Sequence, residues 1–287
     1  MKDKSPKEIL PQFDWQGHRG ARGILPENTI PAFIKALEFP IKTLELDVVV
    51  SKDQKVIVSH EPWMSHHICS KPDGTPVLET DTLLTYDMDY ATIQTYDAGM
   101  RGNERFPAQQ KMKVAKPSFK EMVQTIEQHC LQNNRALPYY NIELKSRPDW
   151  YEKIIPVPEK FAALVLQEIK DLGIHARTNL QCFDLDVLKA IHQQDASMST
   201  ALLVEKAETF EVALQELKFT PPFFSPYFLT LNKAIVDRVH ERGMKVIPWT
   251  ANETTQMLEL IEMGVDGIIT DYPNRIETVL DSLQIQK

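Results

Sequence analysis

The stretch "TLELDVVV", residues 43–50, alternates apolar and charged side chains and ends in three valines, a pattern that predicts a β-strand. Successive side chains of a strand point to opposite faces, so Glu45 and Asp47 share one face and the leucines share the other. Two carboxylates on one shielded face are costly unless a charged partner faces them. The stretch therefore predicts a buried strand that carries a site.

Short β-branched stretches of this kind recur along the chain and alternate with longer amphipathic stretches. We predict strands at 13–18, 43–50, 139–145, 177–183, 199–204, 222–227, 245–250 and 266–270, an additional short strand at 55–60, and helices at 29–39, 118–134, 157–172, 184–194, 207–218, 231–243, 253–263 and 274–283. About eight strand–helix units favour an α/β fold of the TIM (β/α)₈ barrel type, which takes about 250 residues. A doubly wound sheet is the alternative, but it normally has fewer units.

One stretch, residues 61–116, breaks the alternation with the turn-forming sequences "KPDGTP", "DAG" and "NERFP". We interpret it as a small insertion subdomain after the second barrel strand, placed over the face where such barrels carry their active sites. The sequence shows neither an internal repeat nor a Gly/Ser linker. We therefore expect a single barrel domain over residues 13–283 that includes this insertion.

A third carboxylate comes from the stretch "YYNIELKS", where Asn141, Glu143 and Lys145 share one face of a strand. With Glu45 and Asp47 it makes an oxygen-rich cluster, and carboxylate oxygens are the ligands that Mg²⁺ and Ca²⁺ prefer. We predict one divalent cation there, with Lys145 as a point charge for a substrate phosphate. The alternatives are that lysine or arginine neutralises the carboxylates, or that Glu143 simply pairs with Lys145.

Two histidines, His18 and His60, follow predicted strands. An imidazole titrates near neutral pH, so a pair can deprotonate a nucleophile and protonate a leaving oxygen. Arg19 offers a fork of N–H donors suited to phosphate oxygens. In the "PENT" turn that follows, Asn28 or Thr29 can cap a helix, so these residues have little claim to substrate contact.

Composition excludes several classes of protein. The net charge of −8 argues against broad attraction to nucleic acid or an anionic bilayer. The three cysteines are too widely spaced for a disulfide framework or a CxxC metal site. No apolar run approaches the roughly 18 residues of a membrane span, and the first 15 residues lack the apolar core of a signal peptide. We expect a soluble, cytoplasmic protein, or a periplasmic or exported one if a signal peptide has been removed. The sequence carries no pattern that indicates the oligomeric state.

An ordered set of motifs supports a more specific interpretation. It consists of His18-Arg19, "PENT", Glu45-Leu46-Asp47, His60, Glu143-Leu144-Lys145, "WTAN" at 249–252 and "GIITDYP" at 267–273. In this order the set resembles the glycerophosphodiester phosphodiesterase family from about residue 15 to about residue 280. The stretch 61–116 is similar to the extra subdomain of that family.

The resemblance implies roles for individual residues. His18 and His60 would be the acid/base pair, Glu45, Asp47 and Glu143 the ligands of a Mg²⁺ or Ca²⁺ ion, and Arg19 and Lys145 the phosphate clamp. Trp249 would form an aromatic wall near a glycerol group. The implied reaction cleaves deacylated phospholipids, which are small-molecule glycerophosphodiesters, to sn-glycerol 3-phosphate and an alcohol.

The chain departs from the family pattern at "QCF", where we expect serine rather than Cys182, so the contact of Gln181 with substrate is less well supported. Two other functions stay open. One is a phospholipase D-like activity on lysophospholipids or sphingomyelin, with an acyl groove formed by residues 61–68 and 222–229. The other is a barrel that binds phosphodiesters without cleaving them.

Overall fold

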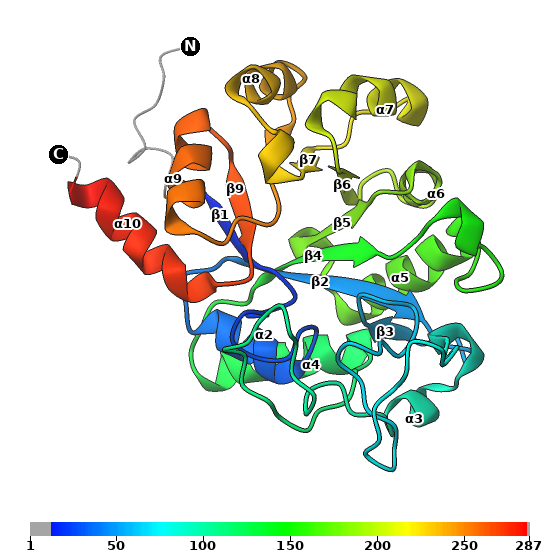
Figure 1. Ribbon diagram of the computed structural model, residues 1–287. Helices are drawn as coiled ribbons and strands as arrows, with labels where there is room; N and C mark the ends of the chain where they lie inside the picture. Colours follow the sequence, from blue (N-terminus) through cyan, green and yellow to red (C-terminus); the bar gives the residue numbers. More distant parts are fainter. Residues whose placement is uncertain (1–12, 286–287) are drawn as a thin grey trace.

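The computed structural model describes residues 13–285, which form a nearly closed barrel of parallel strands with helices outside it (Figure 1). The first twelve residues, where we expect no signal peptide, lie outside this range. The barrel strands are β1 (Asp14–Gly17), β2 (Thr43–Val50), β4 (Tyr139–Leu144), β5 (Thr178–Cys182), β6 (Ser199–Val204), β7 (Phe223–Pro226), β8 (Lys245–Val246) and β9 (Gly267–Thr270). Around the barrel the order is β8, β7, β6, β5, β4, β2, β1, β9. The predicted TIM-barrel fold is confirmed.

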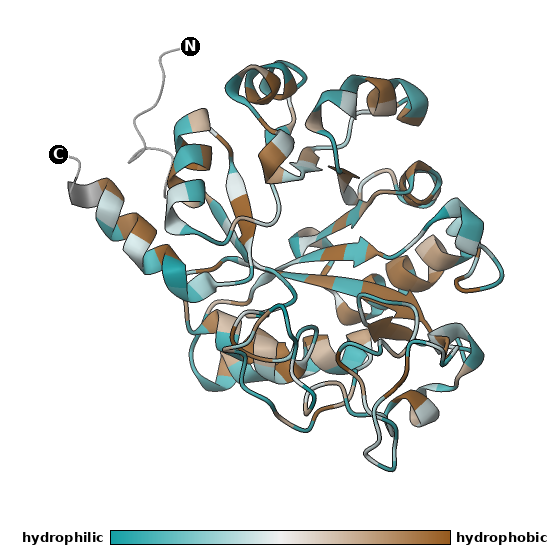
Figure 2. Cartoon of the chain, in the orientation of Figure 1, coloured by the Kyte–Doolittle hydropathy of each residue, from teal (hydrophilic) through white to brown (hydrophobic). Residues whose placement is uncertain are grey.

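The helices follow the strands as expected. They are α2 (Ile30–Leu37), α4 (Phe119–Gln132), α5 (Pro158–Leu172), α6 (Leu185–Gln194), α7 (Phe210–Leu217), α8 (Lys233–Glu241), α9 (Thr254–Met263) and α10 (Ile276–Ile285). In Figure 2 they carry both hydrophobic and hydrophilic residues, as helices do that pack one face on a barrel. None of the helices within residues 13–285 combines the length and apolarity needed to cross a bilayer.

Strand β8 is the main departure from the predicted boundaries, because it ends at Val246 rather than at 250. Pro248 has no N–H group and cannot extend a regular ladder. The chain still bridges β7 and β9 here: Trp249 N donates to Pro226 O at 3.0 Å, and Ile269 N donates to Pro248 O at 3.0 Å. These backbone bonds bring the last strand next to the eighth and nearly close the barrel.

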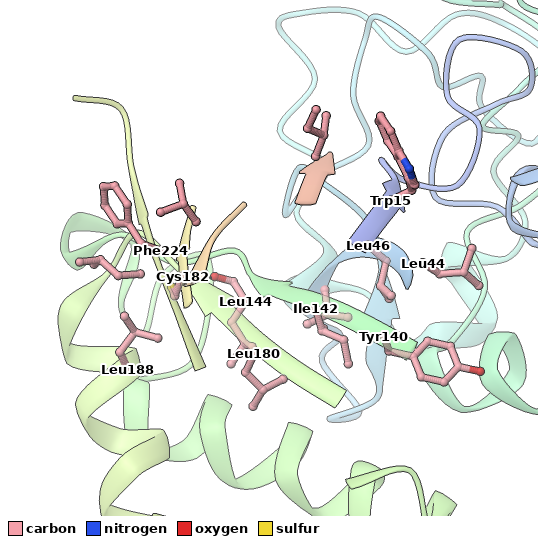
Figure 3. Packing of buried hydrophobic residues seen from close by; sticks show 14 of the residues in the cluster. Trp15, Leu44, Leu46, Tyr140, Ile142, Leu144, Leu180, Cys182, Leu188 and Phe224 are labelled. Carbon is pink, nitrogen blue, oxygen red and sulfur yellow. Dashed lines mark hydrogen bonds between the residues drawn. The ribbon is translucent and has the colours of Figure 1, made fainter. Parts of the chain in front are cut away.

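The strand period of two separates a hydrophobic face from a polar one. Leu46, Ile142 and Leu180 are fully buried, and Figure 3 shows them packed with residues of neighbouring strands and of α6. The inward face of the same strands carries Glu45, Asn141 and other polar side chains. Burial of the outward face stabilises the barrel, because each fully buried aliphatic side chain contributes roughly 1.5–3 kcal/mol. The inward face is therefore available for the polar side chains that form a site.

The stretch 61–116 follows β3 (Val56–Val58), which pairs antiparallel with β2. It contains the short helices η2 (Thr85–Asp87) and α3 (Tyr90–Ile93), and it forms a second hydrophobic cluster with residues of β2 and β3. Two side chains join it to the loop after β1: Asn103 Nδ2 donates to Glu27 Oε2 at 3.3 Å, and Gln109 Nε2 donates to Arg22 O at 2.6 Å. The stretch therefore supports the loop that carries Arg19.

Candidate active site

A cavity of about 740 Å³ opens at the C-terminal ends of the barrel strands. All the predicted site residues except Asp47 line it: His18, Arg19, Glu45, His60, Glu143, Lys145, Gln181 and Trp249. Asp47 is fully buried beside the cavity and lies next to Glu143 in the pairing of β2 with β4. The structure thus gathers the predicted residues, drawn from six strand ends, into one place.

Three carboxylates cluster at this cavity, two of them in its lining and the third buried beside it. Glu45, Asp47 and Glu143 each offer an oxygen, and these oxygens lie within 4.8 Å of one another. Burial, and then the charge of Asp47, raises the pKa of Glu45 well above its usual value. Burial would also raise the pKa of Asp47, but the charges of Arg19, His60 and Lys145 outweigh it and hold this pKa low. The cluster is held together against its own repulsion by nearby cations.

One oxygen atom of the cluster has the surroundings expected of a metal ligand. Asp47 Oδ1 is buried and has no hydrogen-bond partner among the described residues. Buried carboxylate oxygens normally accept hydrogen bonds or coordinate a cation. Together with the close approach of three carboxylates, this atom shows that the residues present suit a hard divalent cation.

Arg19 and Lys145 lie in this cluster as ion pairs. Arg19 Nη1 lies 2.6 Å from Glu27 Oε1, and its Nε lies 3.1 Å from Asp47 Oδ2. Lys145 Nζ lies 2.6 Å from Glu143 Oε1, which is the pairing that the sequence left open. Lys145 lines the cavity and presents its ammonium group beside the carboxylates. Arg19 is committed to Glu27 and Asp47, so a bound phosphate would share its guanidinium with them.

The glycines around His18 shape the turn that presents it. Gly20 has φ +82°, and a Cβ on it would lie 2.6 Å from the carbonyl carbon of Ala32 in α2. A side chain is therefore excluded here by the helix behind the loop. Thr29 caps that helix, since its Oγ1 accepts from Ala32 N at 3.4 Å, while Asn28 Nδ2 donates to Asp47 Oδ2 at 2.8 Å. "PENT" therefore orders the turn and, through Asn28, the acidic cluster.

His18 is oriented by Asp271, at the end of β9. Its Nδ1 lies 2.6 Å from Asp271 Oδ1, which leaves Nε2 on the side of Glu45, 3.8 Å from Glu45 Oε2. Burial and the charge of Arg22 lower the pKa of His18 to about 4, although Asp271 opposes them. At neutral pH His18 is therefore a neutral imidazole whose Nδ1 carries the proton toward Asp271.

His60 is more exposed than His18 and has a different partner. Its Nδ1 lies 2.8 Å from Glu61 Oε1, the side chain of the next residue. Burial opposes ionisation of Glu61, but the hydrogen bond and charge of His60 outweigh it and lower the pKa of Glu61. The two histidines thus enter the same cavity, each with its own carboxylate.

Gln181 and Trp249 complete the predicted set. Gln181 Nε2 donates to Glu45 Oε1 at 2.9 Å, so it supports a carboxylate of the cluster. Trp249 Nε1 donates to Ser225 O at 2.9 Å, and its ring contacts that of Phe183 edge-on at 5.6 Å. Cys182 points outward into the hydrophobic core (Figure 3), so its replacement of the expected serine does not alter the cavity.

Sequence reasoning missed Asp271, which orients His18, and the residues that hold Asp271 in place. Arg22 donates from Nε and Nη2 to Asp271, and Asn252 Nδ2 donates to Asp271 Oδ2 at 2.8 Å. Asp271 and Asn252 stand in "GIITDYP" and "WTAN", which we used only as family motifs. The signal was present, because Asp271 follows a strand directly, just as His18 does.

The fold and the cavity define a (β/α)₈-barrel enzyme whose site combines three buried carboxylates with two histidines. The family model of the glycerophosphoryl diester phosphodiesterase family matches residues 18–275. A glycerophosphodiester phosphodiesterase of Bacillus subtilis is 31% identical over 96% of this chain and 87% of its own length. The chain therefore belongs to this family, and it is a phosphodiesterase.

Solved structures agree with this assignment. The crystal structure of a candidate glycerophosphoryl diester phosphodiesterase from Silicibacter pomeroyi has a TM-score of 0.84 and 27% identity, and the match covers 97% of this chain and 98% of that one. A phosphodiesterase of Oleispira antarctica, in complex with its product sn-glycerol-3-phosphate, has a TM-score of 0.75 at 21% identity and is matched over 97% of this chain and 100% of its own. The second likeness shows the shared barrel fold.

Proposed function

We propose that this phosphodiesterase hydrolyses glycerophosphodiesters to sn-glycerol 3-phosphate and an alcohol, with His18 and His60 as its acid/base pair. The observation that carries the proposal is the placement of His18 Nε2 at 3.8 Å from Glu45 Oε2, at the edge of the three-carboxylate cluster. A group bound on that cluster would lie beside an imidazole able to move a proton. Membership of the family and the product found in the Oleispira antarctica structure support the choice of substrate.

Glu45, Asp47 and Glu143 would hold a divalent cation, Mg²⁺ or Ca²⁺. When bound, such an ion supplies positive charge to the phosphoryl oxygens. Lys145 lies beside Glu143 and would place a second positive charge on a non-bridging oxygen. Arg19 holds Asp47 in place and adds its own charge to the same side of the cavity.

The surroundings of His18 support one of the two possible assignments of acid and base. His18 is neutral and has a free Nε2, so we assign it to take the proton from the attacking hydroxyl, either of water or of the neighbouring glycerol carbon. His60 would then give a proton to the leaving oxygen as the bond from phosphorus to that oxygen breaks. Attack by the glycerol hydroxyl passes through a cyclic phosphate that water opens afterwards. In the cyclic route the second step restores the pair, because His60 takes a proton from the water and His18 gives one to the glycerol oxygen. After direct attack by water the two histidines exchange protons with the solvent.

The test is release of sn-glycerol 3-phosphate from glycerophosphocholine, glycerophosphoethanolamine and glycerophosphoglycerol. We expect release by the untreated enzyme, loss of release in EDTA, and recovery with Mg²⁺ or Ca²⁺. His18→Ala and His60→Ala should each lower turnover by roughly 10²-fold or more. Near-normal turnover in both variants would refute the acid/base assignment, and His129→Ala, in the last turn of α4, is the matched control.

A second substrate class has some support in the lining of the cavity. Trp150, Phe183 and Leu203 form part of its wall, and Trp63 packs edge-on against Trp150 at 5.8 Å. Such a wall could accept part of an acyl chain. However, Met64 and Ile68 from the suggested acyl groove are buried in the second hydrophobic cluster, and Phe224 is buried in the main core. Turnover of lysophosphatidylcholine exceeding that of glycerophosphocholine would favour the phospholipase D-like activity.

The remaining alternative is binding without cleavage. We disfavour it because the cavity brings together both histidines and all three carboxylates. Tight binding of glycerophosphocholine that stays intact in the presence of Mg²⁺ or Ca²⁺ would establish it.

A further inference from the structure

A second cavity, of about 470 Å³, opens at the opposite end of the barrel, where the strands begin. Its lining includes Asp14, Thr43, Asn179, Phe223 and Lys245, and its deeper part is formed by Gln16, Asn141 and Ser225. Barrels of this type usually fill this region with layers of bulky branched side chains. Here polar side chains and open space take their place.

Two groups of this lining, Ser225 and Lys245, could donate to a bound molecule. Ser225 is 1% exposed, and its hydroxyl makes no hydrogen bond with any described residue. Lys245 is an exposed residue of the cavity lining, with Nζ 6.0 Å from the centre of the Phe223 ring. Both groups are therefore available to donate to a bound molecule.

Asp14 supplies the acceptor. Its Oδ1 accepts from Thr43 Oγ1 at 2.7 Å, and its Oδ2 accepts from Gln16 Nε2 at 2.7 Å. Each carboxylate oxygen can accept a second hydrogen bond, so both still have capacity. Burial raises the pKa of Asp14 above its usual value. This shift is opposed by the hydrogen bonds from Thr43 and Gln16 and by the charges of Lys42 and Lys245.

These groups define the ligand that would fit. One carboxylate facing two lysines is a poor cage for a cation, and the polar floor is a poor site for a purely apolar molecule. A small molecule with an anionic group could place that group at Lys245, while its hydroxyls donate to Asp14 and accept from Ser225. The matching chemistry is that of a hydroxylated organic anion.

A chain of side-chain amides joins this cavity to the catalytic one. Asn141 Nδ2 donates to Gln16 Oε1 at 2.8 Å and to Gln181 Oε1 at 3.0 Å. Gln16 in turn donates to Asp14, and Gln181 donates to Glu45 at 2.9 Å. Each glutamine therefore turns its NH₂ group to a carboxylate and its carbonyl to Asn141.

We propose that the cavity at the N-terminal ends of the strands is a second binding site, which takes a small hydroxylated organic anion and transmits its occupancy through the amide chain to Glu45. A ligand hydroxyl that donates to Asp14 Oδ2 shares that oxygen with Gln16 Nε2 and so weakens the hydrogen bond from Gln16. The side chain of Gln16 then moves, which changes the hydrogen bond from Asn141 Nδ2 to Gln16 Oε1. Asn141 moves in response, which changes its hydrogen bond to Gln181 Oε1. The coupling is reciprocal by linkage, and it does not depend on which phosphodiester the enzyme cleaves.

The test uses ¹⁵N-labelled full-length protein titrated with D-glycerate, followed through the side-chain NH₂ resonances of Gln16, Asn141 and Gln181. We expect all three to shift in a saturable way. Lys245→Met should weaken the apparent affinity by roughly threefold to tenfold, because it removes the positive charge that faces the anionic group and solvent screens that charge in part. Ser225→Ala should weaken it by a smaller factor.

The control is Lys145→Met, which alters the catalytic cavity and should leave the titration at Gln16 unchanged. If glycerate binds only at the catalytic cavity, Lys145→Met will abolish the shifts and Lys245→Met will not, which overturns the second site. The absence of any saturable shift overturns it as well. Shifts at Gln16 and Asn141 without one at Gln181 would overturn the transmission to Glu45.

Discussion

The Nδ1 atom of His18 lies 2.6 Å from Oδ1 of Asp271, although 253 residues separate them in the chain. The contact follows from the pairing of the first strand with the last, which sets Gly17 beside Thr270 (Figure 1). Each of these strands is followed directly by its polar residue. Asp271 therefore fixes which nitrogen of His18 carries the proton and which one faces the carboxylates.

Replacing Asp271 by asparagine should lower kcat by roughly 10²- to 10⁴-fold, because His18 loses the acceptor that keeps its proton on Nδ1. The expected change in KM is small, since Asp271 does not line the cavity. Steady-state kinetics on glycerophosphocholine would measure both. Asp281→Asn, in the exposed part of α10, is the matched control, and equal kcat values for the two variants would contradict the positioning role.

Replacing Glu143 by glutamine should weaken binding of Mg²⁺ or Ca²⁺ by about tenfold or more, because the cluster loses one of its three negative charges. Isothermal titration calorimetry on protein treated with EDTA measures this directly. Glu277→Gln, on the exposed face of α10, should bind as the parent does. Unchanged metal affinity in Glu143→Gln would exclude that residue as a ligand.

Replacing Ile142 by alanine should lower stability and leave activity unchanged, whereas replacing Glu143 should weaken metal binding. Ile142 is fully buried in the main core, so the free energy of unfolding should fall by about 2–5 kcal/mol. Activity per folded molecule should stay close to that of the parent. Urea unfolding followed by circular dichroism, with kinetics on the same samples, separates the two effects. A large loss of kcat with unchanged stability would show that Ile142 affects the site.

The pair His240–Asp266, with Nε2 and Oδ2 2.8 Å apart, should make stability depend on pH. The hydrogen bond that His240 Nε2 donates to Asp266 Oδ2 raises the pKa of His240 in the folded state. Its contribution is therefore complete below the unfolded pKa of about 6.5 and is lost as pH rises through the higher folded pKa. Thermal unfolding should show His240→Ala destabilised more at about pH 5.5 than at about pH 8.5, by a modest amount because the pair is partly exposed. A larger loss at the higher pH would reverse the assigned direction.

Much of the barrel and its acidic cluster could be predicted from local sequence. A period of two over "TLELDVVV" and "YYNIELK" is enough to place Glu45, Asp47 and Glu143 on the inward face, because parallel neighbours keep that alternation in register. The predicted end of β8 was wrong by four residues. Its apolar residues fit a strand, but Pro248 interrupts the ladder.

The partners of the site residues could not be predicted in the same way. Hydrogen bonds such as that between Arg22 and Asp271 depend on which strands become neighbours when the barrel closes, and local periodicity carries no information about that. The amide chain shows the same limit. Asn141 was placed on the correct face of its strand, but its contacts with Gln16 and Gln181 need three separate strands in register.

The pairing of β1 with β9 also sets the order in which the enzyme becomes competent during its synthesis. A ribosome makes His18 early and Asp271 close to the end, and the first strand has no β9 neighbour until nearly the whole chain has emerged. In a nascent chain that lacks β9, His18 has no aspartate to orient it. On the proposed mechanism, proton transfer by His18 would therefore begin only late in translation, when the last strand pairs with the first.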